Sequence, residues 1–208
     1  MSTTTPRFQT IGIVGTGAMG RGIAQIAAQA GSTVLLFDTQ PDAVTKARDA
    51  VSTQWDKLVE KGRIDAAAAS AQKARLKPAA ALADLDVKKK LFAELEGIVQ
   101  PTAVLATNTS SLSVTAIAAA LKRPQQFAGF HFFNPVPLMK VVEVIAGLKT
   151  DPAVCQALAE YARQMGHTPV QAEDTPGFIV NHAGRGYGTE ALRIVSEGVA
   201  DFATIYRI

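Results

Sequence analysis

Short apolar runs alternate with amphipathic segments along most of this chain. The runs predict buried strands at residues 10–15, 32–38, 103–107, 126–132, 140–145 and 168–173. Apolar residues at helical spacing, with Pro, Asp or Ser at the starts and Gly at the ends, predict helices over residues 18–30, 41–61, 65–76, 86–97, 113–121, 152–165 and 176–198. Strands that alternate with helices favour an α/β fold with a mostly parallel sheet covered on both faces.

One stretch interrupts this alternation. Residues 77–86 read KPAAALADLD and contain no run of Val, Ile or Phe that predicts a strand. Two predicted helices therefore follow one another without the strand that the pattern requires.

Composition narrows the class of protein. With 208 residues, 48% hydrophobic and 19% charged, the chain is predicted to form one domain, or one domain and the beginning of a second. The net charge is +3, but Lys and Arg are spread along helices, so we expect anionic small molecules rather than nucleic acid as partners. No apolar run approaches a membrane span. One cysteine, Cys155, and no signal-peptide core favour a cytoplasmic protein.

A glycine-rich loop follows the first predicted strand. The sequence GTGAMG places Gly15, Gly17 and Gly20 at the spacing of a dinucleotide-binding turn, with Ala18 and Met19 between the last two. Its glycines suit a tight turn, close approach of a pyrophosphate and helix packing, and the following helix presents free N–H groups. An incidental Gly-rich turn is the alternative.

Asp38 ends the second predicted strand, 18 residues after the loop. A carboxylate at this position can accept both ribose hydroxyls and repels a 2′-phosphate, which favours NAD over NADP. Asp38 is also a candidate N-cap for the helix that starts at Pro41, and the two roles are compatible.

A histidine and a glutamate occupy unusual positions in two neighbouring strands. His131 lies in an apolar segment, and Glu143 is surrounded by valines, where an unpaired carboxylate is costly. The Asn-Pro-Val-Pro segment between them predicts a turn that brings Glu143 back beside His131. Such a pair sharpens the imidazole as a proton acceptor. The alternative for His131 is a satisfied core histidine.

Four segments, IGIVGTGAMGRGIAQIAAQAG, LATNTSSLSVTAIA, FAGFHFFNPVPLMKVVEVI and DTPGFIVN, resemble the L-3-hydroxyacyl-CoA dehydrogenases in order and spacing. The resemblance covers about residues 8–205. It implies a Rossmann-type, doubly wound fold over residues 1–182, followed at 183–208 by the start of a helical dimerisation domain. It also implies NAD, an acyl-CoA substrate and a homodimer, and no metal.

The resemblance assigns roles to particular residues. His131 is the base, Glu143 its partner, and Ser110 and Asn181 contact the reacting oxygen of the substrate. Cofactor contacts fall on the glycine loop, Asp38 and three further positions, Lys88, Asn108 and Asn134. Lys61 matches a lysine that contacts coenzyme A.

Simpler interpretations exist for several of these residues. Ser110 or Ser111 suits the N-cap of helix 113–121, and Asn134 suits a loop. Lys61 on a helix face is solvated by default. His167 and His182 are predicted to lie at the surface.

The chain departs from the family near Asp84 and Leu85. Relatives carry a strand of the form DLVIEAV there, followed by a glutamate that contacts NAD, and about a dozen residues are absent here. The missing strand would lie beside the first one, which we therefore expect to lack a ladder partner. Either the printed sequence closes over these residues or the polypeptide lacks them, and an intact mass of 21.9 kDa would indicate a true deletion.

The predicted function is hydride transfer between NAD and C3 of a 3-hydroxyacyl-CoA. The alternative is a dinucleotide-binding module of the same fold without turnover, either a remnant or a crystallin-like relative. Acyl-chain preference does not follow from the sequence, although part of residues 181–194 is similar to bacterial members that act on adipyl-type esters.

Overall fold

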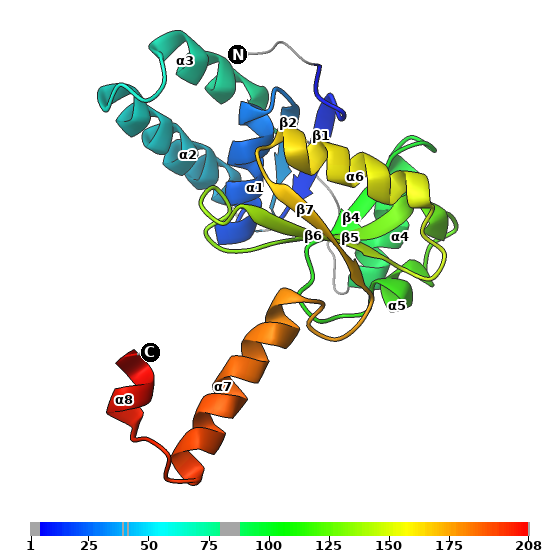
Figure 1. Ribbon diagram of the computed structural model, residues 1–208. Coiled ribbons are helices and arrows are strands. Elements are labelled where there is room, and N and C mark those ends of the chain that lie inside the picture. Colours follow the sequence, from blue (N-terminus) through cyan, green and yellow to red (C-terminus); the bar gives the residue numbers. More distant parts are fainter. Residues whose placement is uncertain (1–4, 39, 41, 80–87, 208) are drawn as a thin grey trace.

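The computed structural model describes residues 5–38, 40, 42–79 and 88–207 (Figure 1). The first part of the chain forms a parallel sheet of order β1-β2-β3 with three helices. Its elements are β1 (Thr10–Val14), α1 (Ala18–Gln29), β2 (Thr33–Phe37), α2 (Ala43–Glu60), α3 (Ala66–Arg75) and β3 (Leu76–Pro78).

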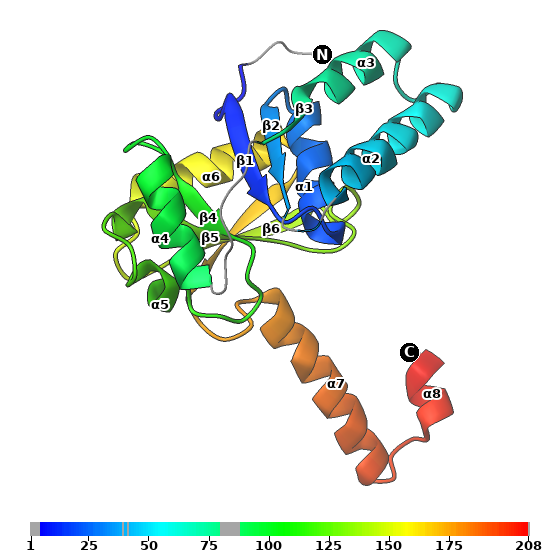
Figure 2. The same cartoon turned by 180° about the vertical axis from the view of Figure 1, so that it is seen from behind.

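The second part forms a four-stranded sheet of order β4-β5-β6-β7, in which only β5 and β6 are antiparallel. Its elements are α4 (Lys88–Ile98), β4 (Leu105–Thr107), α5 (Val114–Ala118), the short 3-10 helix η1 (Pro124–Gln126), β5 (Phe127–Phe132), β6 (Val141–Ala146), α6 (Pro152–Gln164) and β7 (Thr168–Glu173). Helix α6 covers one face of this sheet, and α5 with α4 covers the other (Figures 1 and 2). The predicted α/β, Rossmann-like fold is confirmed.

One hydrophobic core joins the two sheets. It contains residues of β2 such as Val34, residues of β6 such as Val144, and the buried face of α6, including Cys155. Tyr161 of α6 donates its hydroxyl hydrogen to Ser32 Oγ at 2.6 Å, and Ser32 Oγ in turn donates to the backbone of Phe8. Burial, against the opposing effect of the Ser32 hydrogen bond, raises the pKa of Tyr161 to about 12.

The sheets are separate where the sequence predicts a missing strand. Within the described residues, β1 pairs with β2 alone and β4 pairs with β5 alone. Strand β1 has three exposed residues, Thr10, Gly12 and Val14. The first strand of such a fold is normally covered on both faces. The prediction that the first strand lacks a ladder partner on its other side stays a prediction, because residues 80–87 lie outside the described part of the chain.

Two predictions about elements were wrong in the first half of the molecule. Leu76, predicted to end a helix, begins the strand β3, because its buried side chain and the edge of β2 supply the contacts that local sequence does not. Pro78 is tolerated there because β3 is an edge strand. Helix α2 begins at Ala43 behind Asp42, so Asp38 is not its N-cap; Pro41 lies outside the described residues, as do Asp84, Leu85 and Asp86.

The helices predicted at residues 113–121 and 176–198 are shorter in the structure. Helix α5 ends at Ala118 rather than 121, and the chain after β7 makes turns before α7 (Val180–Ser196) begins, four residues beyond Pro176. A last helix, α8 (Phe202–Arg207), was not predicted.

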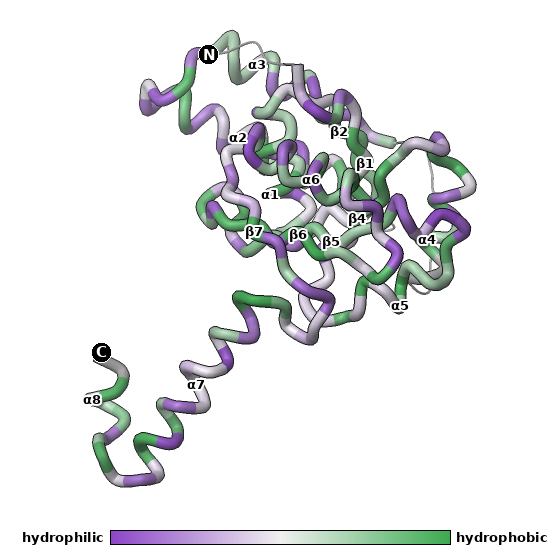
Figure 3. Tube along the Cα trace, turned by 45° about the vertical axis from the view of Figure 1, so that its right-hand side comes forward, coloured by the Kyte–Doolittle hydropathy of each residue, from purple (hydrophilic) through white to green (hydrophobic). Residues whose placement is uncertain are grey.

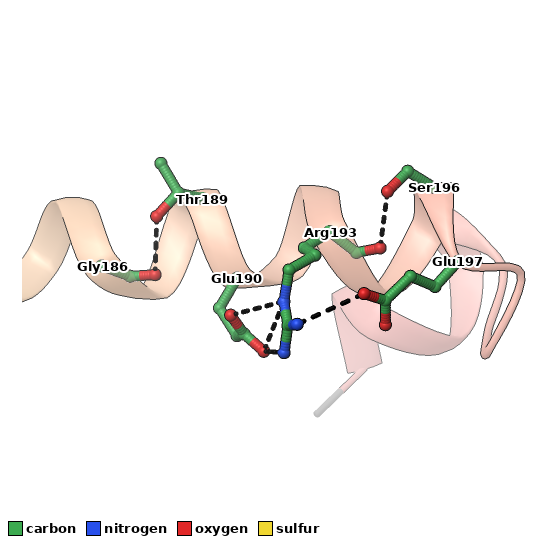
Figure 4. Close-up of polar contacts among 6 residues, drawn as sticks. All are labelled: Gly186, Thr189, Glu190, Arg193, Ser196 and Glu197. Atoms are coloured by element: carbon green, nitrogen blue, oxygen red, sulfur yellow. Dashed lines mark hydrogen bonds and ion pairs between the residues drawn. The ribbon is translucent and has the colours of Figure 1, made fainter.

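Helix α7 projects away from the α/β body (Figures 1 and 2) and none of its residues is buried. Figure 3 shows hydrophobic and hydrophilic positions alternating along it, and Tyr187 and Leu192 are exposed. Local bonds support its second half: Arg193 pairs with Glu190 and Glu197 one turn away on either side (Figure 4). The bond from Arg193 lowers the pKa of Glu190. In the part of the chain that the structure describes, no helix has the length and apolar character needed to cross a membrane.

Candidate active site

His131 and Glu143 lie directly opposite each other in the β5–β6 ladder. The antiparallel register points both side chains to the same face, where His131 Nδ1 lies 2.6 Å from Glu143 Oε2. Both side chains are almost completely buried, with exposures of 3% and 0%. The turn predicted from the Asn-Pro-Val-Pro segment thus brings the pair together.

The second carboxylate oxygen of Glu143 binds the start of α7. Oε1 accepts hydrogen bonds from the backbone N–H groups of Ile179, at 2.9 Å, and Val180, at 2.8 Å. These are two of the N–H groups that a helix N-terminus leaves without internal partners, and the helix dipole favours an anion there. Glu143 is therefore held in place as a carboxylate, which explains how an acid is accommodated among buried valines.

The other ring nitrogen of His131 faces Ser110. Nε2 lies 3.1 Å from Ser110 Oγ, and Ser110 is exposed. A carboxylate can only accept, so we assign the hydrogen of the neutral ring to Nδ1, which leaves Nε2 as the acceptor. The basic nitrogen of the pair therefore faces the accessible side of the site.

Two aromatic rings enclose the imidazole. Phe133 lies edge-on to His131 at 4.6 Å between ring centroids, and Phe178 does so at 5.5 Å. Phe178 is buried and has φ of +51°, in the left-handed region, directly after Gly177 at +85°. A bulky residue in this conformation costs free energy, so the packing and hydrogen bonds around residues 177–180 must hold it.

The segment after β4 is fixed beside β5. Asn108 Oδ1 accepts a hydrogen bond from the backbone N–H of Phe132 at 2.8 Å, one residue beyond His131. The N-cap of α5 is Ser113, whose hydroxyl accepts from the N–H of Ala116 and donates to Asp174. The interpretation of Ser110 or Ser111 as the helix cap is therefore wrong, and Ser110 is available to His131.

The glycine loop has the geometry that its spacing predicts. Gly15 has φ of +91°, which favours glycine, and a Cβ on Gly20 would lie 1.8 Å from the Gly15 carbonyl oxygen. Around Gly17, the N-cap of α1, a Cβ would meet nothing within 4 Å, and no side chain caps the helix. Ala18 and Met19 form the first turn of α1. The N-terminus of α1 therefore presents uncapped N–H groups at an open position.

Asp38 holds the glycine loop. Its Oδ2 accepts hydrogen bonds from the backbone N–H of Thr16 at 2.6 Å and from the Thr16 hydroxyl at 2.8 Å. Its Oδ1 accepts from the N–H of Gln40. These bonds occupy both lone pairs of Oδ2 and one of Oδ1, so in this structure Asp38 fixes the conformation of the loop.

A small cavity of about 70 Å³ lies between α1 and the turn after β5. Asn134 and Pro135 line it from the turn, and Arg21, Gly22 and Gln25 line it from α1. Helix α1, which follows the glycine loop, and the turn after β5 therefore line the same cavity.

The structure places three further predicted site residues at the ends of helices. Asn181 is half-buried in the first turn of α7 but makes no side-chain hydrogen bond within the described residues. Lys61 is the exposed C-cap of α2, at the α2–α3 turn, far from β5 and β6 in both views (Figures 1 and 2). Lys88 starts α4, and its side chain lies outside what the structure describes.

Sequence reasoning missed or misplaced several residues. The backbone of Ile179 and Val180 carries no side-chain signal for binding Glu143, and nothing local predicts the left-handed Phe178. The sequence places Thr16 in the glycine loop but does not predict its hydrogen bonds to Asp38. His167, predicted at the surface, is 4% exposed, so that prediction was wrong, whereas His182 is exposed as predicted.

Comparison with known proteins agrees with this geometry. Residues 10–175 match the family described as 3-hydroxyacyl-CoA dehydrogenase, NAD binding domain. The chain is 44% identical to the 3-hydroxyadipyl-CoA dehydrogenase of Escherichia coli over 92% of its own length and 43% of that protein. It is 37% identical to a probable 3-hydroxybutyryl-CoA dehydrogenase of Deinococcus radiodurans, over 91% of the chain and 73% of the relative.

Solved structures show the same fold. The crystal structure of (S)-3-hydroxybutyryl-CoA dehydrogenase from Ralstonia eutropha superposes with a TM-score of 0.87 at 36% identity, over 95% of this chain and 75% of that one. The Escherichia coli 3-hydroxybutyryl-CoA dehydrogenase also gives 0.87, at 42% identity, over 93% and 44%. The fold and glycine loop are those of an NAD-binding dehydrogenase domain. The chain belongs to the 3-hydroxyacyl-CoA dehydrogenase family, and it spans less than half the length of its Escherichia coli relatives.

Proposed function

We propose that this chain carries the NAD-dependent oxidation of a 3-hydroxyacyl-CoA to a 3-oxoacyl-CoA, and the reverse reaction. The observation that supports this most is the buried His131–Glu143 pair, with its free acceptor Nε2 directed at Ser110. Burial, a fixed tautomer and an accessible basic nitrogen are what a general base for a secondary alcohol requires.

In this proposal His131 Nε2 accepts the proton of the substrate's 3-hydroxyl while the hydride leaves C3. NAD, when bound, accepts that hydride at its nicotinamide ring. Glu143, held by the N–H groups at the start of α7, offsets the charge of the imidazolium. Ser110 and Asn181 hold the substrate oxygen where negative charge develops in the reverse reaction.

The residues fit NAD as the cofactor. The uncapped N-terminus of α1, with no acidic residue in its first turn, suits a pyrophosphate. Asp38 would hold the ribose hydroxyls, and Asn108, which is bonded to Phe132, and Asn134, in the turn after β5, would contact the cofactor. The family's roles for Lys61, with coenzyme A, and Lys88, with NAD, remain part of the proposal.

We also propose that residues 183–208 begin a second, helical unit through which the chain dimerises. The exposed apolar residues of α7, such as Tyr187 and Leu192, support this. Sedimentation velocity tests it: a dimer that dissociates on Tyr187→Lys supports the proposal, and a monomer at all concentrations contradicts it. The single cysteine and the reaction favour the cytoplasm.

A second function is a dinucleotide-binding module without turnover. Within the described residues β1 pairs with β2 alone, and three of its residues are exposed. This favours the module without turnover, because the cofactor site of a doubly wound sheet is built beside its first strand. NADH oxidation with acetoacetyl-CoA, measured beside NADH binding by fluorescence, separates the two. Oxidation supports the enzyme, binding without oxidation supports the module, and absence of both contradicts both.

A further inference from the structure

His167 is a buried histidine with two acceptor-only neighbours. Its Nδ1 lies 3.1 Å from the carbonyl oxygen of Met165, and its Nε2 lies 3.0 Å from the carbonyl oxygen of Val136. A carbonyl oxygen cannot donate, so each contact is a hydrogen bond only where the ring nitrogen carries a hydrogen. With its hydrogen on Nε2, the ring donates to the Val136 carbonyl oxygen.

The end of α6 fixes the position of the ring. Gly166, with φ of +76°, and His167 close the helix through N–H bonds to Arg163 and Ala162. Met165 is the C-cap of α6, and its carbonyl oxygen lies beside Nδ1 of the ring. Phe132 lies edge-on at 5.5 Å. No ion pair or side-chain hydrogen bond joins His167 to a charged residue in the described part of the chain.

The contact to Val136 connects His167 with the cofactor helix. Val136 is buried, and its side chain fills the space beside Gly22 of α1: a Cβ on Gly22 would lie 2.7 Å from Val136 Cβ. The same turn carries Asn134, which lines the cavity against α1. His167 therefore joins the end of α6 to the turn after β5, and the Val136 side chain joins that turn to α1.

We propose that His167 is a positioning residue: through a hydrogen bond from Nε2 to the Val136 carbonyl oxygen, it clamps the turn at residues 134–137 onto α1 and so fixes the cofactor side of the active site. This rests on the proposed function for its effect on NAD, but the clamp itself is a property of the fold. His167 touches neither reacting atom and acts through the Val136 carbonyl.

The protonation of the ring can be observed directly, because the chain has only three histidines. Long-range ¹H–¹⁵N spectra of the labelled full chain should show a hydrogen on Nε2 of one buried ring, whose signals disappear in His167→Leu. The exposed His182 is the matched control, and His182→Gln should leave that ring unchanged. A His167 ring with its hydrogen on Nδ1 and none on Nε2 would overturn the clamp.

Hydrogen exchange tests the positioning without any cofactor. The turn contains the bonds from the N–H groups of Leu138 and Met139 to the Pro135 carbonyl. In His167→Leu these amides should exchange about tenfold faster, while those of β5 and β6 keep their rates. Unchanged exchange at 138 and 139 would refute the clamp, and acceleration throughout the sheet would assign His167 a role in general stability only.

Cofactor binding tests the functional consequence. His167→Leu should weaken NADH binding by about tenfold, while turnover at saturating NADH changes little because the His131–Glu143 pair is untouched. Val136→Ala should have a similar effect with the His167 ring signals intact, and the double variant should be no worse than the single ones. Normal NADH binding in His167→Leu would overturn the link between His167 and the cofactor. Failure of the unaltered chain to bind NADH would instead overturn the proposed function. In that case the spectra and the exchange rates decide whether the clamp exists.

Discussion

The carboxylate of Glu143 is shared between His131 and the first turn of α7. One oxygen lies 2.6 Å from His131 Nδ1, and the other accepts hydrogen bonds from the N–H groups of Ile179 and Val180. The residue that contacts the imidazole therefore also binds the start of the projecting helix. A change in the direction of α7 would move the Glu143 carboxylate and, through it, the His131 imidazole.

Replacement of Glu143 should separate its two roles. Glu143→Gln keeps an oxygen for the α7 N–H groups but loses the charge, so we expect turnover to fall by roughly 10²–10⁴-fold with a modest loss of stability. Glu143→Ala leaves the imidazole and two N–H groups unpaired in the interior, which should cost about 3–5 kcal/mol. Thermal unfolding and NADH oxidation check both variants. Wild-type turnover in Glu143→Gln would contradict the assigned role.

Phe178 should act on the rate rather than on substrate binding. Phe178→Leu keeps a buried apolar side chain but removes the ring that limits movement of the imidazole. We expect kcat to fall about 10–100-fold, with KM nearly unchanged, because a small displacement of a catalytic group is costly. Phe133→Leu, which removes the other ring in contact with His131, is the matched comparison. A change confined to KM would show that Phe178 contacts substrate instead.

Asp174 should make folding stability depend on pH. Burial raises its pKa, but hydrogen bonds from Thr115, Val114 and Ser113 outweigh this and lower the pKa overall. A lowered folded-state pKa stabilises the protein above the unfolded value, about 3.9, and this stabilisation is lost as the pH falls through the folded value. Asp174→Asn should cost about 1 kcal/mol at pH 7 and flatten the acid limb of a denaturation profile. An unchanged acid limb would rule out this contribution.

Asp38 should select the cofactor and support the glycine loop. Asp38→Ala removes the acceptor of both Thr16 bonds and the charge that repels a 2′-phosphate. We expect NADH to bind about tenfold more weakly and the preference over NADPH to shrink, as measured by fluorescence titration. Thr16→Val, which removes only the hydroxyl bond, should have a smaller effect and keep the preference. An unchanged preference in Asp38→Ala would assign Asp38 to the loop alone.

Much of the fold followed from the sequence because its signals are local. The glycine spacing, the strands around His131 and Glu143, and the Asn-Pro-Val-Pro turn each have a direct steric cause. The pairing of His131 with Glu143 followed because an antiparallel connection by a short turn leaves few registers.

The remaining features depend on tertiary contacts. Leu76 forms a strand because the β2 edge is available, which no local pattern encodes. His167 looks like a surface residue in Gly-His-Thr, but the end of α6 turns it inward against two carbonyls. The conformation of Phe178 and the use of backbone N–H groups by Glu143 are equally invisible in the sequence, since both depend on how α7 leaves the body.

The central claim is that His131 is the base for the proposed hydride transfer. The most direct test compares NADH oxidation by the unaltered chain and by His131→Gln, each with acetoacetyl-CoA and with NADH affinity measured by fluorescence. We predict that the variant binds NADH with nearly unchanged affinity and loses roughly 10²–10⁴-fold in turnover. Turnover retained in His131→Gln, in a protein that folds and binds NADH normally, would contradict the account.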